Sequence, residues 1–345
     1  MRLSDAARAV LDDAVEAGAV PGLVGAKVDA DGRCDTHAAG VTREGGPPVR
    51  PSTRFDLASL TKVVATLPCL LRLLSDGALA LDERLGERFA NAGWFQTPSL
   101  ADTKVEALLT HTAGLPAWQP LFARVAERRT ALAAVLQAPL TAVGQVRYSD
   151  LGFMLLGALV ERVAGRRLDE AAQALVFAPL GLDGLGFGPL PDDDVAATEH
   201  CGWRGRLLVG EVHDENAAVW GGIAGHAGLF GDAAALAAYA AAWLRADPAL
   251  ASPDLQRRAV TPSARSEDGS LRGLGWLLPS PGVFAGDTAR GFGHTGFTGT
   301  SLWIDPAAGV ASLLLTNRVH PHRDARSGIQ GLRRRFHAAV HGNAR

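Results

Sequence analysis

The feature that most constrains the fold is the placement of strand-type segments at the two ends of the chain. Near the start, residues 22–28 and a run that ends at Val41 flank an Asp-Gly turn signal. Near the end, residues 301–304 and 310–316 flank a loop rich in turn residues. Most of the sequence between these ends shows the apolar period of helices. This order predicts one α/β layer built from both termini, with a helical domain inserted between them.

Helix signals define the rest of the chain. Ser4 is placed to cap an N-terminal helix, and a closing helix is predicted over residues 323–340. A helix is also predicted over residues 59–76, with a kink or division at Pro68 because proline lacks a backbone N–H. A further strand is predicted over residues 271–278. The other predicted helices share the helical apolar period and cover residues 105–109, 121–136, 151–163, 168–176 and 233–244.

We therefore expect two intertwined domains. The first is a discontinuous α/β domain of residues 1–65 and 230–345, and the second is a mainly helical domain of residues 66–229. The chain has 345 residues, of which 47% are hydrophobic and 20% are charged, so each part has enough apolar residues for a core.

Charge and targeting signals exclude several classes of function. The net charge of −2 gives no electrostatic reason to expect a nucleic acid or an anionic membrane surface as partner. The sequence shows no apolar stretch of membrane-spanning length and no apolar segment typical of a secretory signal near Met1, so we expect a cytoplasmic protein, or a periplasmic one if a leader has been removed. The cysteines are odd in number and widely spaced, which predicts free thiols at Cys34, Cys69 and Cys201.

Ser59 and Lys62 are the first candidates for catalysis. On a helix they lie one turn apart on the same face, so the amine can reach the hydroxyl. A serine hydroxyl needs a neighbouring base to become a nucleophile, and lysine can be that base whereas arginine cannot. Only 3 of the 34 basic residues are lysines, so lysine here is a rare choice. The apolar neighbours Val63 and Val64 predict a desolvated amine with a lowered pKa.

Two further motifs carry polar groups at the starts of predicted elements. Tyr148 comes just before the helix predicted from residue 151, where its phenol could relay a proton or simply pack. His294-Thr295-Gly296 lies between glycines, just before the strand that begins near residue 300. Glycine lets the backbone approach a ligand closely, so this segment is a candidate substrate-binding edge.

Taken together and in this order, the three motifs resemble those of the serine β-lactamase and penicillin-binding protein superfamily. The resemblance is closest to the branch of class C β-lactamases, DD-peptidases and esterases, whose last motif is Lys-Thr-Gly or His-Thr-Gly. Residues 108–115 (LLTHTAGL) and 225–230 (GHAGLF) also resemble segments of that branch, and the similarity extends from about Pro21 to about Asn317.

The resemblance implies a fold and a set of roles. The fold would be the β-lactamase/DD-peptidase-like one, an antiparallel sheet flanked by terminal helices with an inserted helical domain. Ser59 would be the acylated nucleophile, Lys62 and Tyr148 the general bases, and the backbone N–H groups of Ser59 and Phe297 the oxyanion hole. The residues that would contact the substrate are Asp150, His294, Thr295 and Gly296.

Two positions depart from the pattern of the lactamases. Asp150 replaces an asparagine, and an ionised aspartate can only accept hydrogen bonds, so a substrate amide carbonyl loses a donor. A carboxylate close to Lys62 would also raise the pKa of that amine. His294 replaces a lysine of the β-lactamases and, when neutral, binds a carboxylate less strongly. These changes favour an esterase, with a D-amino-acid peptidase (DD-carboxypeptidase) or a weak β-lactamase as alternatives.

Other interpretations compete with a serine hydrolase. His213, Asp214, Glu215 and His226 offer metal-ligand side chains, although their spacing lacks the HExxH pattern, so a metallohydrolase is the weaker hypothesis. A non-catalytic penicillin-binding sensor or scaffold is another. We expect no metal, no cofactor and no nucleotide, and a small ester, amide or peptide-like molecule as substrate. The sequence does not indicate an oligomeric state.

Overall fold

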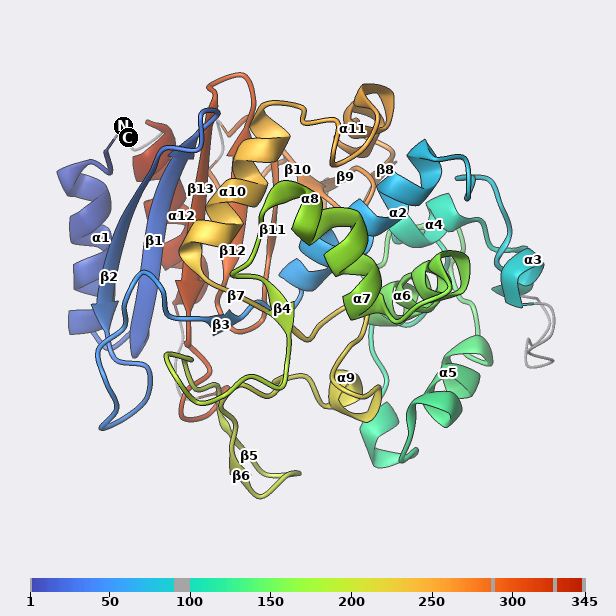
Figure 1. Cartoon of the computed structure of the whole chain (residues 1–345), viewed down its shortest axis with the longest axis horizontal. Coiled ribbons are helices and arrows are strands. Elements are labelled where there is room, and N and C mark those ends of the chain that lie inside the picture. The colour runs from blue at the N-terminus through green and yellow to red at the C-terminus, as the bar shows by residue number, and fades with distance from the viewer. Residues whose placement is uncertain (1, 90–99, 287–288, 325–327, 343–345) are drawn as a thin grey trace.

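A computed structural model describes residues 2–89, 100–286, 289–324 and 328–342 of the chain. Its centre is an eight-stranded sheet with the strand order β2-β1-β13-β12-β11-β10-β9-β8, in which the neighbouring strands run antiparallel (Figure 1). The strands are β1 (Gly22–Asp29), β2 (Cys34–Gly40), β8 (Ala264–Arg265), β9 (Leu271–Arg272), β10 (Leu277–Leu278), β11 (Phe292–Thr295), β12 (Ser301–Asp305) and β13 (Val310–Thr316).

The two ends of the chain meet in the middle of this sheet. The hairpins β1–β2 and β12–β13 form as the turn signals predict, and β1 then pairs with β13, with Leu23 opposite Thr316 and Asp29 opposite Val310. The predicted α/β layer made from both termini is therefore present.

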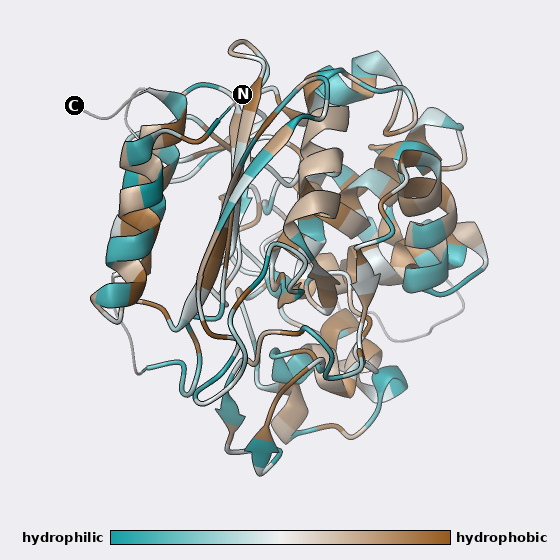
Figure 2. Ribbon diagram, turned by 60° about the vertical axis from the view of Figure 1, so that its left-hand side comes forward, coloured by the Kyte–Doolittle hydropathy of each residue, from teal (hydrophilic) through white to brown (hydrophobic). Residues whose placement is uncertain are grey.

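Helices cover both faces of the sheet. The terminal helices α1 (Asp5–Glu16) and α12 (Ile329–His341) share one face, where they enclose a separate apolar cluster with β1 and β13 (Figure 1). Gly25 of β1 allows them to approach, since a Cβ there would lie 2.5 Å from Leu11 Cδ1. The helix α10 (Ala233–Leu244) packs on the other face as part of the main core. Hydrophilic and apolar residues alternate along the terminal helices, as expected for amphipathic helices (Figure 2).

The helical region packs beside this sheet and shares the main core with it. At its centre α6 (Asp150–Ala164) is capped by Ser149, whose Oγ accepts from the Gly152 N–H, and ends at Gly165 in the left-handed region. The other helical segments are η1 (Lys62–Thr66), α2 (Leu67–Ser75), α3 (Leu85–Phe89), η3 (Leu100–Asp102), α4 (Val105–Leu109), η4 (Leu121–Ala123), α5 (Arg128–Leu136), α7 (Leu168–Ala172), η5 (Gln173–Phe177), α8 (Ala178–Leu180), α9 (Glu215–Val219) and α11 (Pro253–Ala259).

The structure has two small sheets besides the eight-stranded one. One has the order β3-β7-β4 and consists of β3 (Phe55–Asp56), β7 (Leu229–Gly231) and β4 (Gly186–Phe187). The other is the hairpin of β5 (His200–Cys201) and β6 (Arg206–Leu207), which stands out from the body of the molecule (Figure 1). The strand β3 leads directly into the segment that carries Ser59, so the first small sheet positions that segment.

Several predicted elements are wrong in detail. The strand over residues 271–278 is a hairpin of β9 and β10, because Gly275 turns the chain at φ +74°. The helix over residues 121–136 is divided, since Glu127 is extended. The closing helix begins only after Gly328, whose φ of +97° belongs to the left-handed region. The predicted helix over residues 59–76 is divided just before Pro68. The π-helical turn η1 ends at Thr66, and Pro68 lies in the first turn of α2.

Two further observations concern membrane-spanning helices and the cysteines. Among the described residues, no helix is both long and apolar enough to cross a membrane. Cys34, Cys69 and Cys201 are free thiols, as predicted. The division into domains at residues 65/66 and 229/230 stays a prediction.

Candidate functional site

The predicted residues meet in one cavity of about 740 Å³ between the sheet and the helical region. Its lining includes Ser59, Tyr148, Asp150 and the segment from His294 to Phe297. Lys62 lies at its floor, fully buried against the serine. The structure thus brings together every catalytic and substrate-contacting residue that the sequence predicts.

Ser59 follows a strained turn. Ala58 has φ +46°, a left-handed conformation that is uncommon for alanine, and such strain persists where the surroundings hold it. Asp56 supplies part of that support, because its Oδ1 accepts from the Ala58 N–H at 2.8 Å and its Oδ2 accepts from the His213 N–H at 2.7 Å. Asp56 is 2% exposed, and this burial raises the pKa of its carboxyl. No motif in the sequence marks Asp56.

Lys62 makes three polar contacts at the floor of the cavity. Its Nζ donates to Ser59 Oγ at 2.9 Å and to the His226 carbonyl at 3.1 Å, and it lies 2.7 Å from Asp150 Oδ1. Desolvation lowers the pKa of this amine, but the charge of Asp150 and the contribution of Tyr148 outweigh it, so the pKa is raised above 10.5. The prediction of a lowered Lys62 pKa, made from the apolar neighbours, is therefore wrong. The raised pKa is the one predicted for a carboxylate of Asp150 close to Lys62.

Tyr148 stands above Lys62 at the entrance to α6. Its ring centroid lies 5.1 Å from Lys62 Nζ and 4.8 Å from the ring of His111. His111 Nδ1 accepts from the Ser149 N–H at 3.1 Å, which fixes the turn that carries Tyr148. His111 therefore has a structural role. Burial lowers the pKa of His111 well below its usual value, so its ring is neutral.

The strand β11 forms the opposite wall. His294 is buried, and desolvation together with the charges of Arg272 and Lys62 lowers its pKa well below the usual value, so the imidazole is neutral. Its Nδ1 lies 2.9 Å from the Thr295 carbonyl and therefore carries the proton. His294 Nε2 is then an acceptor, and it has no hydrogen-bond partner among the described residues.

The loop after β11 is fixed by close packing on Leu57 and by hydrogen bonds from Arg333. Gly296 is required here, because a Cβ would lie 2.5 Å from the Leu57 carbonyl oxygen. Arg333 of α12 donates to the carbonyls of Gly296 and Thr300 at 2.6 and 2.9 Å. Within the described parts of the chain, no hydrogen bond engages the backbone N–H of Phe297 or that of Ser59. Two amides that border the cavity are thus available to a ligand oxygen.

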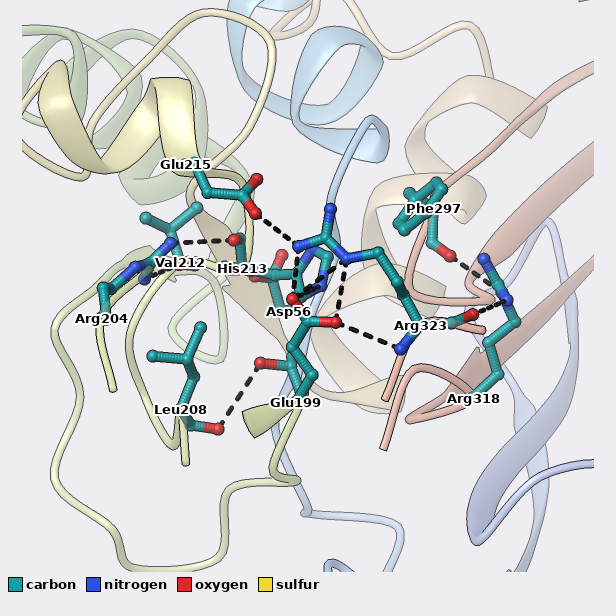
Figure 3. A network of polar contacts seen from close by, with 11 residues as sticks. Asp56, Glu199, Arg204, Leu208, Val212, His213, Glu215, Phe297, Arg318 and Arg323 are labelled. Carbon is teal, nitrogen blue, oxygen red and sulfur yellow. Dashed lines mark hydrogen bonds and ion pairs between the residues drawn. The ribbon is translucent and has the colours of Figure 1, made fainter. Parts of the chain in front are cut away.

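The ring of Phe297 contacts two other side chains, and Figure 3 shows the Phe297 carbonyl bound by Arg318. The His213 ring stacks on it at 5.6 Å, and the Arg318 guanidinium lies 4.9 Å from its ring centroid. Arg318 Nε also donates to the Phe297 carbonyl at 3.0 Å. On the side of His213 away from Phe297, Glu199 Oε1 lies 3.2 Å from His213 Nε2. This network fixes the loop whose amide faces the cavity.

The metal-ligand side chains are engaged within the protein. Glu199, Cys201 and Glu215 have potential ligand atoms within 4.8 Å of one another, the one such group in the part of the chain that the structure describes. The Arg323 guanidinium binds both carboxylates and provides the positive charge that a cation would bring (Figure 3). His226 Nε2 lies 2.9 Å from Asp214 Oδ1, so these two side chains of the cluster proposed for a metallohydrolase contact each other.

Arg272 of β9 is a cavity residue that the sequence analysis missed. Its guanidinium carbon lies 5.5 Å from the Tyr148 ring centroid, and no ion pair with it occurs among the described residues. Its Nε is buried without a hydrogen-bond partner, and burial lowers the pKa of the guanidinium. No motif marks this residue, because one arginine among many gives no signal in sequence.

Comparisons with known proteins identify the family of the chain. The family model described as Beta-lactamase matches residues 7–334. A protein of Escherichia coli (strain K12) named "Putative D-alanyl-D-alanine carboxypeptidase" is 32% identical over 312 residues, which cover 78% of this chain and 70% of that protein. The predicted superfamily and its fold class are thereby confirmed.

Solved structures show the same fold over the whole chain. The hydrolase EstCE1, described as having promiscuous acyltransferase activity, superposes with a TM-score of 0.79 at 23% identity, covering 99% of this chain and 98% of that one. A class C beta lactamase from Rhodobacter sphaeroides gives a TM-score of 0.77 at 19% identity, covering 99% of this chain and 100% of that one.

Proposed function

The chain is a serine hydrolase of the Beta-lactamase family, and from that premise we propose that it cleaves ester or amide bonds through an acyl-enzyme on Ser59. The observation that carries the proposal is the 2.9 Å hydrogen bond between Lys62 Nζ and Ser59 Oγ at the floor of the cavity. A positive group on the serine oxygen favours the developing alkoxide, which makes this serine the nucleophile of the cavity.

The proton of Ser59 goes to Tyr148 in this proposal. Lys62 has a raised pKa and is protonated at neutral pH, so it has no lone pair with which to accept. We propose that the Tyr148 oxygen acts as a phenolate beside the Lys62 ammonium and takes the serine proton while Ser59 Oγ bonds to the substrate carbonyl carbon. The carbonyl oxygen then carries the negative charge, and the amides of Ser59 and Phe297 stabilise it. Tyr148 returns the proton to the leaving group as the bond to that group breaks.

Deacylation follows the same path with water. Water gives a proton to Tyr148 and attacks the acyl carbon, and the bond to Ser59 Oγ breaks as the oxygen regains a proton. Lys62 remains an ammonium throughout, positioned by Asp150 and the His226 carbonyl.

An ester is the substrate that this cavity supports best. Asp150 is bound to Lys62 and can offer a substrate amide no hydrogen-bond donor, so an amide carbonyl finds no partner there. His294 Nε2 is likewise an acceptor. An ester presents fewer polar groups that would need such partners. We therefore place an esterase first.

A D-amino-acid carboxypeptidase is the second candidate, and Arg272 favours it. A peptide substrate of such an enzyme carries a free carboxylate beside the scissile bond, and an arginine without an ion pair can bind it in a bidentate way. The Escherichia coli relative bears the name of such an enzyme. A weak β-lactamase activity fits the same features, because penicillins also carry a carboxylate.

Intact-protein mass spectrometry tests the proposal. We expect a mass increase equal to the acyl group after incubation with a penicillin, and release of acid from short-chain esters. Ser59→Ala is expected to abolish both, whereas Ser52→Ala, at an exposed serine outside the cavity, leaves both unchanged. Tyr148→Phe is expected to slow acylation by about 10²- to 10⁴-fold, the usual contribution of a general base. A folded Ser59→Ala protein with normal turnover contradicts the proposal, and so does a wild type that is never acylated.

A further inference from the structure

Two exposed tryptophans and a half-buried phenylalanine form a strip that leads out of the cavity. Trp118 is 46% exposed and Trp203 is 48% exposed, and Phe122 lies between them. The ring centroids of Trp118 and Phe122 are 6.3 Å apart, and those of Phe122 and Trp203 are 5.3 Å apart. We call these three residues the aromatic strip. Large apolar side chains in water are costly unless they bind something, so a continuous row of them needs an explanation.

The strip begins inside the catalytic cavity. Trp118 belongs to the lining that also includes Ser59 and Tyr148. The backbone beside Trp118 is tied to the tyrosine turn, because the Asp150 N–H donates to the Ala117 carbonyl at 2.9 Å. A group bound on Trp118 is therefore held in register with the catalytic residues.

The outer part of the strip is also held in place. The Phe122 N–H donates to Asn216 Oδ1 of α9 at 3.1 Å, and Asn216 Nδ2 donates to the Gln119 carbonyl at 2.8 Å. Trp203 stands at the turn between β5 and β6, with the Arg204 guanidinium 5.5 Å from its ring. Arg204 is anchored by hydrogen bonds of 2.6 and 2.9 Å to the carbonyls of Val212 and His213. A rigid aromatic surface loses little entropy on binding, which suits a recognition site.

The exposed apolar residues concentrate at this site. Among the described residues, four large apolar side chains are well exposed: Trp118, Val143, Trp203 and Phe297. Trp118 and Phe297 line the cavity and Trp203 completes the strip, whereas Val143 lies outside both. This distribution is the pattern of a ligand surface rather than of scattered exposure.

We propose that the aromatic strip binds a flat, apolar group of the substrate whose carbonyl is held at Ser59. The inference rests on the proposed function and adds the class of substrate, an ester or amide with an aryl or similarly flat apolar substituent. Stacking on tryptophan rings favours such a group over a short alkyl chain. The group can belong to the acyl part or to the leaving group, since both extend from the same carbonyl.

Hydrolysis of three esters, measured by pH-stat titration, shows whether the flat group on the strip belongs to the acyl part or to the leaving group. Ethyl acetate carries no flat group, ethyl 2-naphthylacetate carries it in the acyl part, and 2-naphthylmethyl acetate carries it in the leaving group. We expect Trp203→Ala to lower kcat/KM about 3- to 10-fold for one naphthyl ester, through KM, the size of a lost aromatic contact. Ethyl acetate is expected to stay within twofold, and the ester that is affected identifies which part of the substrate lies on the strip.

Matched variants keep this test decisive. Trp203→Phe retains a ring and is expected to restore most of the preference, and Val143→Ala, exposed but outside the strip, is expected to change nothing. Trp118→Ala provides a second truncation if Trp203→Ala does not fold. Equal losses for all three esters, or no loss for any, overturn the inference. A dimer of the wild type that Trp203→Ala dissociates, without a change in ester preference, also overturns it. Turnover that survives in Ser59→Ala refutes the proposed function instead.

Discussion

Two cations lie beside Tyr148, and their surroundings differ. Lys62 Nζ is 5.1 Å from the tyrosine ring centroid and the Arg272 guanidinium carbon is 5.5 Å from it. The Lys62 side chain is fully buried, but Asp150 Oδ1 lies 2.7 Å from its Nζ. The pKa of Lys62 is therefore raised. Arg272 has no ion pair at contact distance among the described residues, and burial lowers its pKa, which the charge of Asp268 offsets only in part.

The difference separates a cation of the scaffold from a cation available to a ligand. A buried charge is tolerated when a counter-ion and hydrogen bonds compensate it, and Lys62 has both within the protein. Arg272 lacks that compensation, so an anion that arrives with the substrate gains the interaction that the protein leaves unmade. We therefore assign Lys62 to the chemistry of Ser59 and Arg272 to the choice of substrate.

The largest expected effect comes from removing the compensated cation. Lys62→Met leaves the largely buried Asp150 carboxylate without its partner. We therefore expect the free energy of unfolding to fall by about 3 kcal/mol. Ester turnover is expected to fall by at least about 10³-fold, since the positive group on Ser59 Oγ is lost. Urea unfolding and kcat measured on the same preparation check both expectations.

A double variant distinguishes the two losses. Lys62→Met combined with Asp150→Asn removes both charges, so most of the stability is expected to return while the activity stays low. The wild-type pair has a pH signature as well. The pKa of Lys62 is raised above 10.5, so the stability from the pair is complete below pH 10.5 and is lost as the pH rises through that raised pKa. Recovery of activity in the double variant would contradict the role given to Lys62.

Removing the uncompensated cation is expected to affect selectivity alone. Arg272→Gln should raise KM for a substrate with a carboxylate near the scissile bond about 10- to 100-fold, the strength of a charge-assisted hydrogen bond. Turnover of neutral esters should stay within about threefold, because no step of their cleavage uses the guanidinium. Steady-state kinetics on a D-alanyl-D-alanine peptide and on ethyl acetate compare the two. Equal losses on both substrates would place Arg272 among structural residues.

The sequence predicted the sheet and the contact between Ser59 and Lys62 because both rest on local patterns. The hairpins follow from turn signals, and the contact between Ser59 and Lys62 follows from helical spacing. The sequence predicts an effect of Asp150 on the Lys62 pKa only if the two side chains are close, and a separation of 88 positions in the chain gives no distance. The sign of the Lys62 pKa shift depended on that distance and was therefore wrong where only the apolar neighbours were considered.

Asp56 and Arg272 could not be found in this way. Asp56 acts through the His213 N–H, 157 residues away in the sequence, and only the folded chain brings the two together. Arg272 becomes distinctive only because the structure leaves its Nε without a hydrogen bond and its guanidinium without an ion pair among the described residues, and a sequence does not reveal missing contacts. The strained Ala58 is likewise invisible, because alanine has no preference for positive φ.

A moderate effect is expected when the counter-ion of Lys62 becomes a hydrogen-bond donor. In the wild type, a penicillin should acylate Ser59 and be released slowly, because Asp150 gives the penicillin amide carbonyl no donor. Asp150→Asn supplies an N–H, worth about 1 kcal/mol, so penicillin hydrolysis is expected to rise about 5- to 10-fold. Spectrophotometric turnover of a penicillin by both proteins measures the ratio. An unchanged rate would mean that the side chain at position 150 does not reach the substrate.

The smallest expected effect concerns pH, and it decides which group is the base. Asp150→Asn removes the charge that keeps the pKa of Lys62 high, so desolvation dominates and the pKa falls. If Lys62 serves as an ammonium beside an ionised Tyr148, single-turnover acylation by a short-chain ester should decline in the variant at a lower pH than in the wild type. At pH 7 we expect a loss of about threefold or less, since most of the lysine is still charged there. If Lys62 were itself the base, its neutral form would become more abundant and acylation would rise above the wild-type rate between pH 7 and pH 9. The direction of the change therefore assigns the proton of Ser59 to Tyr148 or to Lys62.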